Sequence, residues 1–168
     1  GLVFLNESKN NFALQIANSE TGILQNLPKG VACTDAVQAV GKIDCKFEKI
    51  QPDALFLASH KVCGPKGVGV LFLKNEDLIQ PTIVGGNQEF GLRAGTENFL
   101  LIAAFSEALA YSIDLVKNGV WQEIEVLRNI LENEVREISK NTMVVGEEEK
   151  RLPNTSCMIT PGWKGESQ

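Results

Sequence analysis

One short polar segment carries a residue that can bond covalently to a carbonyl compound. Ser59, His60 and Lys61 follow an apolar run, and a Gly-Pro loop comes directly after them. A lysine at the end of a buried strand is partly desolvated, which favours its neutral amine. A neutral amine forms imines with carbonyl groups. Lys61 is therefore a candidate for imine chemistry with His60 beside it, and the competing interpretation is an exposed lysine in a turn.

A carboxylate and a carboxamide are expected at the end of a neighbouring strand. Asp35 follows a short apolar run at 31–34, and Gln38 comes three residues later. Sheets of α/β proteins bind ligands at the carboxyl ends of their strands. Asp35 could hold a protonated ring nitrogen there, and Gln38 could hydrogen-bond a ring substituent. The alternative is that Asp35 only caps a short helix that begins at Ala36 and is stopped by Gly41.

A glycine-rich segment at 85–98 is a candidate phosphate site. Thr96 stands where a helix is expected to begin, and Arg93 is close to it. Backbone N–H groups at a helix N-terminus and an arginine both bind phosphate. A surface loop followed by a helix cap is the alternative interpretation. A lysine for an imine, a carboxylate for a ring nitrogen and a phosphate clamp are together what pyridoxal phosphate requires.

The elements that must position these residues are strands first and helices later. Apolar segments at 11–17, 31–34, 53–58 and 68–73 predict strands, and 156–160 predicts one more. A segment rich in Ala, Leu and Ile predicts a helix over 97–116, and apolar residues at three- and four-residue steps predict another over 118–140. This order indicates an α/β layered domain with a mostly parallel sheet. The link at 18–30 is short for a parallel crossover, so we expect no helix there.

Several motifs occur in an order that resembles the cysteine desulfurase family of class V, fold-type I pyridoxal-phosphate enzymes. They lie at 18–22, 35–43, 59–69, 91–98, 152–156 and 162–167, and the resemblance extends over 1–168. It implies a partial cofactor-binding large domain at 1–116, followed at 117–168 by a long helix and the start of a small C-terminal domain.

The resemblance also implies roles for individual residues. Lys61 would hold the cofactor covalently, with His60 beside it as a second catalytic residue. Asp35 would pair with the pyridine nitrogen, and Gln38 and Ser19 would face the ring oxygen. The family usually has Asn at the position of Ser19.

The phosphate would be held from two chains. Ser59 lies in the segment that touches it, although the family usually places its serine at the position of Ala58. Thr96 would reach the phosphate of the neighbouring subunit in a homodimer. No metal ligand set is predicted, because the four cysteines include no C-x-x-C pair.

The implied reaction converts L-cysteine to L-alanine plus an enzyme persulfide. The sulfur would pass to an acceptor protein for iron–sulfur clusters or thiolation. The family's persulfide cysteine lies in a serine-rich loop that this sequence lacks. The alternatives are a non-catalytic remnant or partner-binding fragment, or another class V enzyme such as a selenocysteine lyase or an aminotransferase.

Four cysteines are too few for a disulfide scaffold, which favours reduced thiols and a cytoplasmic protein. The chain has 168 residues, with 16 Lys plus Arg against 21 Asp plus Glu, a formal charge of −5. This balance argues against nucleic acid or an anionic membrane as partner. Its longest uninterrupted apolar runs are far shorter than the ~18 residues of a spanning helix. The absence of Met at position 1 suggests an internal fragment of a longer protein.

Overall fold

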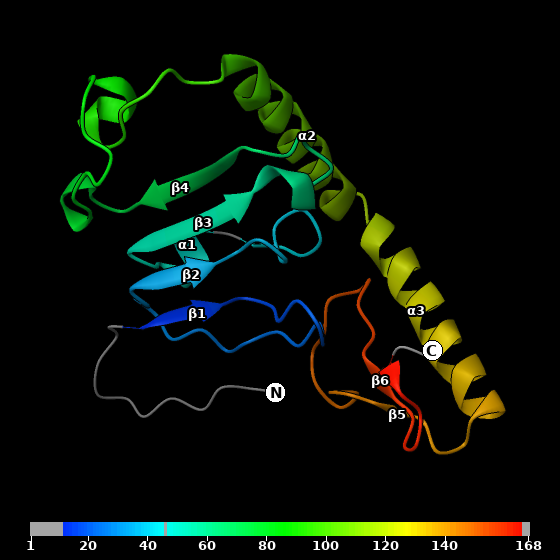
Figure 1. The fold of residues 1–168 in the computed structure, drawn as a ribbon. Coiled ribbons are helices and arrows are strands. Elements are labelled where there is room, and N and C mark those ends of the chain that lie inside the picture. Colours follow the sequence, from blue (N-terminus) through cyan, green and yellow to red (C-terminus); the bar gives the residue numbers. More distant parts are fainter. Residues whose placement is uncertain (1–11, 46, 166–168) are drawn as a thin grey trace.

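A four-stranded sheet forms the centre of the computed structural model, which describes residues 12–45 and 47–165 (Figure 1). The strand order is β1-β2-β3-β4, with the first three strands parallel and β4 antiparallel to β3. The predicted α/β class with a mostly parallel sheet is therefore confirmed. Asn11, Glu166 and Ser167, on which parts of the sequence interpretation fell, lie outside the described residues. The strands are β1 (Ala13–Gln15), β2 (Cys33–Asp35), β3 (Ala54–Ala58) and β4 (Gly69–Leu73).

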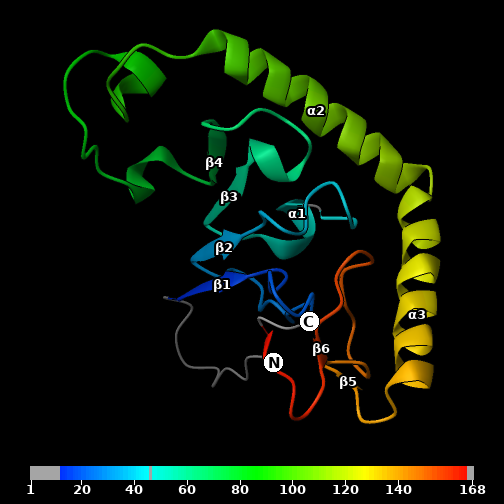
Figure 2. The same ribbon diagram turned by 45° about the vertical axis from the view of Figure 1, so that its right-hand side comes forward.

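Two long helices arch around one side of the sheet (Figure 2). They are α2 (Phe99–Lys117) and α3 (Val120–Ile138), each within two residues of its predicted bounds. The Asn98 side chain caps α2 by accepting a hydrogen bond from the N–H of Leu101 at 3.2 Å. Gly119 separates the helices in the left-handed conformation, with φ of 77°. The smaller elements are α1 (Phe47–Ile50), η1 (Ser59–Lys61), η2 (Glu76–Leu78), η3 (Gln88–Gly91), β5 (Met143–Val144) and β6 (Met158–Ile159).

The connections between the parallel strands differ from the usual helical crossover. Residues 16–32 join β1 to β2 without a helix, as the short link predicts. After β2, the helix expected over 36–40 is present only as hydrogen-bonded turns, with Val40 N–H donating to Ala36 O at 3.0 Å. Gly41 adopts a left-handed backbone within these turns, with φ of 77°, and they continue to Ile43, whose N–H donates to Ala39 O at 3.1 Å.

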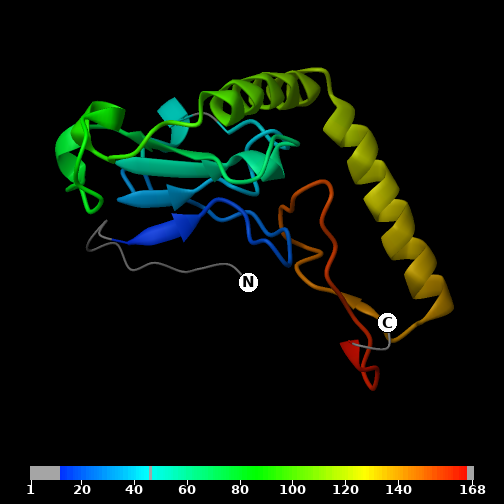
Figure 3. The same cartoon turned by 45° about the horizontal axis from the view of Figure 1, so that its top comes forward.

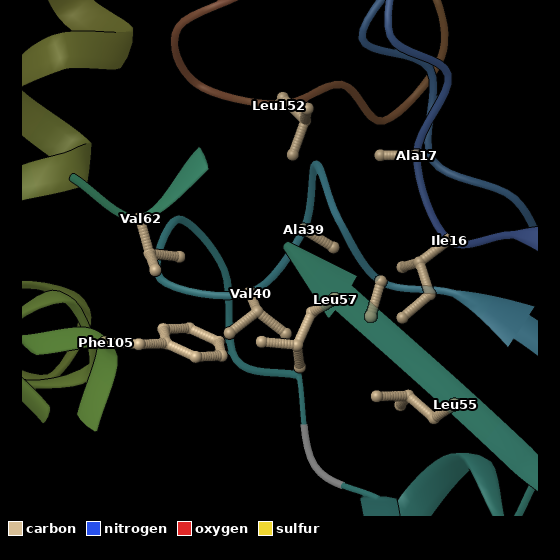
Figure 4. Close-up of a cluster of buried hydrophobic side chains, with 10 residues drawn as sticks. Ile16, Ala17, Ala39, Val40, Leu55, Leu57, Val62, Phe105 and Leu152 are labelled. Atoms are coloured by element: carbon tan, nitrogen blue, oxygen red, sulfur yellow. The ribbon is translucent and has the colours of Figure 1, made fainter. Parts of the chain in front are cut away.

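The hydrophobic core lies between β3, the turns at 36–43 and helix α2 (Figure 4). Leu55 and Leu57 of β3 are buried, whereas Phe56 between them is 37% exposed, so β3 buries one of its two faces. Phe105 of α2 points toward Val40 in the same cluster. The core therefore fixes the turns that follow β2 against α2.

Helix α2 is also fastened to the segment after β3. The Ser112 hydroxyl donates to the carbonyl of Val62 at 3.1 Å. Gly41 lies directly against this contact, because a Cβ at Gly41 would stand 2.7 Å from the Cβ of Ser112. The helix thus holds the loops that follow both β2 and β3.

The C-terminal segment returns to lie between the sheet and α3 (Figure 3). It is joined to α3 by a buried ion pair in which Arg151 donates to Glu132 at 2.7 and 2.9 Å. Arg128 adds a bond from its guanidinium to the carbonyl of Leu152 at 2.7 Å. The hydrogen bond from Arg151 holds the pKa of Glu132 below its usual value, and the same bond raises the pKa of Arg151.

Helix α2 corrects one expectation from the sequence. Among the described residues, Phe99–Lys117 is long and apolar enough to cross a membrane, judged by length and composition alone, with 11% of that stretch buried. This helix contains no long uninterrupted apolar run, because Glu107 and Asp114 divide its apolar sequence. On its inner side, Phe105 and Ser112 pack against the core described above.

Candidate functional site

The carboxyl ends of the three parallel strands bring most of the predicted site residues to one edge of the sheet. Ser19 lies in the loop after β1, Asp35 is the last residue of β2, and Lys61 lies in η1 directly after β3 (Figure 1). Asp35 pairs in register with Phe56 of β3. Because parallel strands end at a common edge, three separate motifs of the sequence meet there.

Asp35 can both cap the turns that follow it and bind a ring nitrogen, the two roles considered from the sequence. Its Oδ1 accepts a hydrogen bond from the backbone N–H of Val37 at 2.8 Å, so the carboxylate does cap the turns that follow. Among the described residues, no hydrogen bond is found to Oδ2. The hydrogen bond to Oδ1 therefore fixes the carboxylate, and Oδ2 can accept a hydrogen bond from a protonated atom of a ligand.

His60 and Lys61 are exposed at this edge. They lie on η1, and the next residue, Val62, is 4% exposed and anchored in the core. This anchor holds the backbone of Lys61 in place while leaving its amine open to a ligand. Cys63 follows with a left-handed backbone (φ 62°) and an exposed thiol.

Ser59 faces away from these two side chains. It is fully buried, and its hydroxyl has no hydrogen-bond partner among the described residues. The hydroxyl packs against Gly64, which adjoins Ala108 of α2. The phosphate contact predicted for Ser59 stays a prediction, since in this conformation the hydroxyl is enclosed beneath Gly64.

Ser19 is exposed in a turn that its neighbour builds. Asn18 Oδ1 accepts hydrogen bonds from the N–H groups of Glu20 at 3.0 Å and Thr21 at 2.9 Å. The hydroxyl of Ser19 only donates to Glu20 at 3.4 Å, at the long end of the hydrogen-bond range. Ser19 therefore lies in the loop after β1, and its short side chain is restrained only by this long hydrogen bond to Glu20.

Gln38 is held by a lysine that sequence reasoning did not single out. The ammonium of Lys42 donates to the Gln38 carbonyl at 2.9 Å and to its side-chain Oε1 at 3.1 Å. Burial, and to a lesser extent the charge of Lys61, lowers the pKa of Lys42. The signal in the sequence was the spacing of four between Gln38 and Lys42, which places the two side chains together on successive helical turns.

Thr96 is exposed ahead of α2, and among the described residues no contact with Lys61 is found. Helix α2 meets the segment after β3 at Ser112, which bonds to Val62, and it lies near Gly64 and Gly67 through Ala108 and Leu101. The predicted phosphate contact of Thr96 with a neighbouring subunit stays a prediction.

The four cysteines are free thiols, and no cluster of His, Cys, Asp or Glu able to hold a metal ion occurs among residues 12–45 and 47–165. Burial raises the pKa of Cys45 to about 11, and the charge of Asp44 adds to this. Burial and the charge of Asp35 raise the pKa of Cys33. These two thiols are thus poorly suited to act as nucleophiles.

The edge as a whole offers an exposed amine, a fixed carboxylate and a fixed carboxamide. Such a set can bind a planar, phosphate-bearing aldehyde covalently through the amine and through a protonated ring nitrogen.

Comparison with known proteins identifies what this arrangement resembles. Residues 4–167 match the family model described as aminotransferase class-V. A cysteine desulfurase from Cereibacter sphaeroides is 37% identical over 164 residues, which cover 92% of this chain and 41% of that protein. The chain thus spans about two-fifths of the length of this curated relative.

Two solved structures extend the comparison to the fold. The NifS-like protein from Rickettsia africae superposes with a TM-score of 0.82 at 27% identity, covering 95% of this chain and 47% of that one. SspA in complex with cysteine matches with a TM-score of 0.53 at 35% identity, covering 58% and 31%.

Proposed function

Because the chain belongs to the aminotransferase class-V family and is similar to its cysteine desulfurases over most of its length, we propose that it forms part of the cofactor site of a pyridoxal-phosphate-dependent cysteine desulfurase. The observation that carries the proposal is the meeting of Asp35, Gln38 and Lys61 at the carboxyl edge of the parallel strands.

The residues present fit pyridoxal phosphate by their chemistry. Lys61 provides the amine that binds the aldehyde, and the Oδ2 atom of Asp35 provides an acceptor for the proton on the pyridine nitrogen. Gln38 provides a fixed carboxamide for the ring oxygen. When bound, the cofactor supplies an electron sink for the α-carbon of an amino acid.

The chain's own residues then have defined tasks. Asp35 keeps the ring nitrogen protonated, since an adjacent carboxylate favours the charged form of a base. Lys61 provides an amine that could carry a proton to or from the α-carbon of a bound amino acid. His60 stands beside it on η1 as a second proton carrier.

The substrate proposed is L-cysteine, supported by the names of the relatives and by the cysteine-bound SspA structure. In the overall exchange the carbon–sulfur bond of L-cysteine breaks, and its sulfur joins a protein thiol to give a persulfide and L-alanine. That thiol, the sulfur acceptor, the homodimer and the cytoplasmic location remain parts of the proposal.

A non-catalytic role is the second candidate, and specific residues favour it. Ser19 provides less reach than Asn would, Ala58 provides no hydroxyl, and the hydroxyl of Ser59 is enclosed. A chain that folds but binds no pyridoxal phosphate would support this candidate. A selenocysteine lyase or an aminotransferase would instead keep the cofactor and differ in its substrate.

Spectroscopic titration tests the proposal. Pyridoxal phosphate is added to the chain and to its Lys61→Ala variant, with Lys140→Met as a matched control at an exposed lysine. We expect a saturable visible absorption band in the wild-type chain and the control, and none with Lys61→Ala. An unchanged band in Lys61→Ala would overturn the assignment.

A further inference from the structure

Lys42 is a buried cation whose partners are unusual. Lys42 is 9% exposed, and among the described residues its ammonium donates hydrogen bonds to two oxygens of Gln38. No carboxylate within 4 Å pairs with it in the part of the chain that the structure describes. Burying an ammonium without a counter-ion is unfavourable, so stability alone gives little reason for a lysine here.

The chemistry of the ammonium fixes the orientation of the Gln38 carboxamide. An ammonium has three donors and no acceptor, so the atom of Gln38 that faces it must be the oxygen. With Oε1 held by Lys42 at 3.1 Å, the NH₂ group is the part of the carboxamide left to contact a ligand. Gln38 itself remains partly exposed, so its NH₂ can be reached.

A contact with the backbone of Gln38 adds to this restraint. Lys42 also donates to the Gln38 carbonyl at 2.9 Å, so one ammonium holds both the main chain and the side chain of the same residue. The residue sits where the turns after β2 pack on α2, with Gly41 against Ser112. Burial, and to a lesser extent the charge of Lys61, lowers the pKa of Lys42.

We propose that Lys42 is a positioning residue that locks the Gln38 carboxamide with its NH₂ group presented at the carboxyl edge of the sheet, as a donor to the cofactor's ring oxygen. The proposal rests on the proposed function for the identity of that acceptor. Its purely structural alternative is that Lys42 only ends the turns at 36–43 by binding the Gln38 carbonyl.

Nuclear magnetic resonance of the ligand-free chain tests the lock directly. The side-chain amide of Gln38 is assigned by its loss in Gln38→Ala, and its order is measured in wild type, Lys42→Met and Lys42→Arg, with Lys140→Met as control. We expect an ordered Gln38 NH₂ group in wild type and Lys140→Met, mobile in Lys42→Met and ordered again in Lys42→Arg. A Gln38 amide equally mobile in all four chains would overturn the proposal.

Binding of pyridoxal phosphate tests the consequence. A hydrogen bond of ordinary strength predicts that Lys42→Met weakens binding by about 3- to 10-fold. The same substitution should cost nothing further in a Gln38→Ala background, since Lys42 acts through Gln38. An equal loss in both backgrounds would contradict the positioning role.

Gln38→Glu separates positioning from structure even where Lys42→Met does not fold. A carboxylate at position 38 keeps, and strengthens, the contact with Lys42 but removes the NH₂ donor. We expect unimpaired thermal stability together with weaker cofactor binding; unimpaired binding would overturn the proposal. If the wild-type chain shows no Lys61-dependent binding at all, the proposed function fails, and the order of the Gln38 amide still decides whether the lock exists.

Discussion

Four thiols in one chain differ in reactivity because their surroundings differ. Cys63 is exposed two residues beyond Lys61, whereas Cys45 lies partly buried near the end of the turns after β2. The thiolate is the reactive form, so burial acts twice, by blocking access and by raising the pKa. The exposed thiol is therefore the one that reports on the candidate site.

Alkylation of the native chain with iodoacetamide at pH 8 should modify Cys63 first and Cys45 last. The pKa of Cys45, raised to about 11, leaves almost no thiolate at this pH. Peptide mapping by mass spectrometry gives the order. In denaturant all four cysteines should react at similar rates, and preferential modification of Cys45 in the native chain would contradict the structure.

Two elements of the fold follow from local sequence, and others do not. The bounds of α2 and α3 were predictable to within two residues because apolar composition and three- and four-residue periodicity are local signals. The short helix expected over 36–40 forms only hydrogen-bonded turns, because Gly41 has a left-handed backbone and lies against Ser112, which is distant in sequence. The edge of the sheet could be predicted from the motifs, but the role of Lys42 needed the atomic contacts.

Gly41→Ala should destabilise the chain by roughly 3 kcal/mol, because it combines a disfavoured left-handed backbone with a steric clash. The added Cβ would lie 2.7 Å from the Cβ of Ser112. Gly162→Ala is the matched control, since Gly162 also has a positive φ (85°) but no atom within 4 Å of the added Cβ. It should cost only the backbone part, about 1 kcal/mol. If urea unfolding showed equal losses of unfolding free energy for Gly41→Ala and Gly162→Ala, the described packing of α2 on this turn would be contradicted.

The buried pair of Glu132 and Arg151 should make stability depend on acid pH. Because the folded state holds the pKa of Glu132 below its usual value, its contribution is present above pH 4.5 and is lost as pH falls through the lowered pKa. Glu132→Gln should cost about 3 kcal/mol at pH 7 by leaving Arg151 unpaired.

The control for this pair is Glu137→Gln, whose side chain is 75% exposed and pairs with Lys140. It should change the free energy of unfolding by less than about 0.5 kcal/mol. Thermal unfolding monitored from pH 7 to pH 3 would reveal the difference. If Glu132→Gln lost stability with falling pH in the same way as wild type, the Glu132–Arg151 pair would not be the source of this acid dependence.

The proposed homodimer bears on Thr96, which is exposed ahead of α2. The family resemblance assigns the phosphate contact of Thr96 to a cofactor held on Lys61 of the neighbouring subunit. The homodimer proposed above would supply it.

Mixing two variants of the full-length protein tests this requirement. Lys61→Ala removes the amine and Thr96→Ala removes the phosphate contact, so a mixed dimer has one complete site if Thr96 acts between subunits. We expect unfolding and refolding the two variants together to restore tight cofactor binding that neither variant has alone. Failure of the mixed dimer to regain binding would contradict a Thr96 contact made between subunits, and unimpaired binding by Thr96→Ala alone would place Thr96 outside the site.

The central claim is that the carboxyl edge of β1–β3 places Lys61 where pyridoxal phosphate binds. Its most direct measurement is reduction of the chain with borohydride in the presence of pyridoxal phosphate, followed by mass-spectrometric mapping of the modified lysines. We expect saturable modification at Lys61, with the other lysines unmodified at saturation. Unsaturable labelling scattered over exposed lysines, with Lys61 no more modified than Lys140, would contradict it.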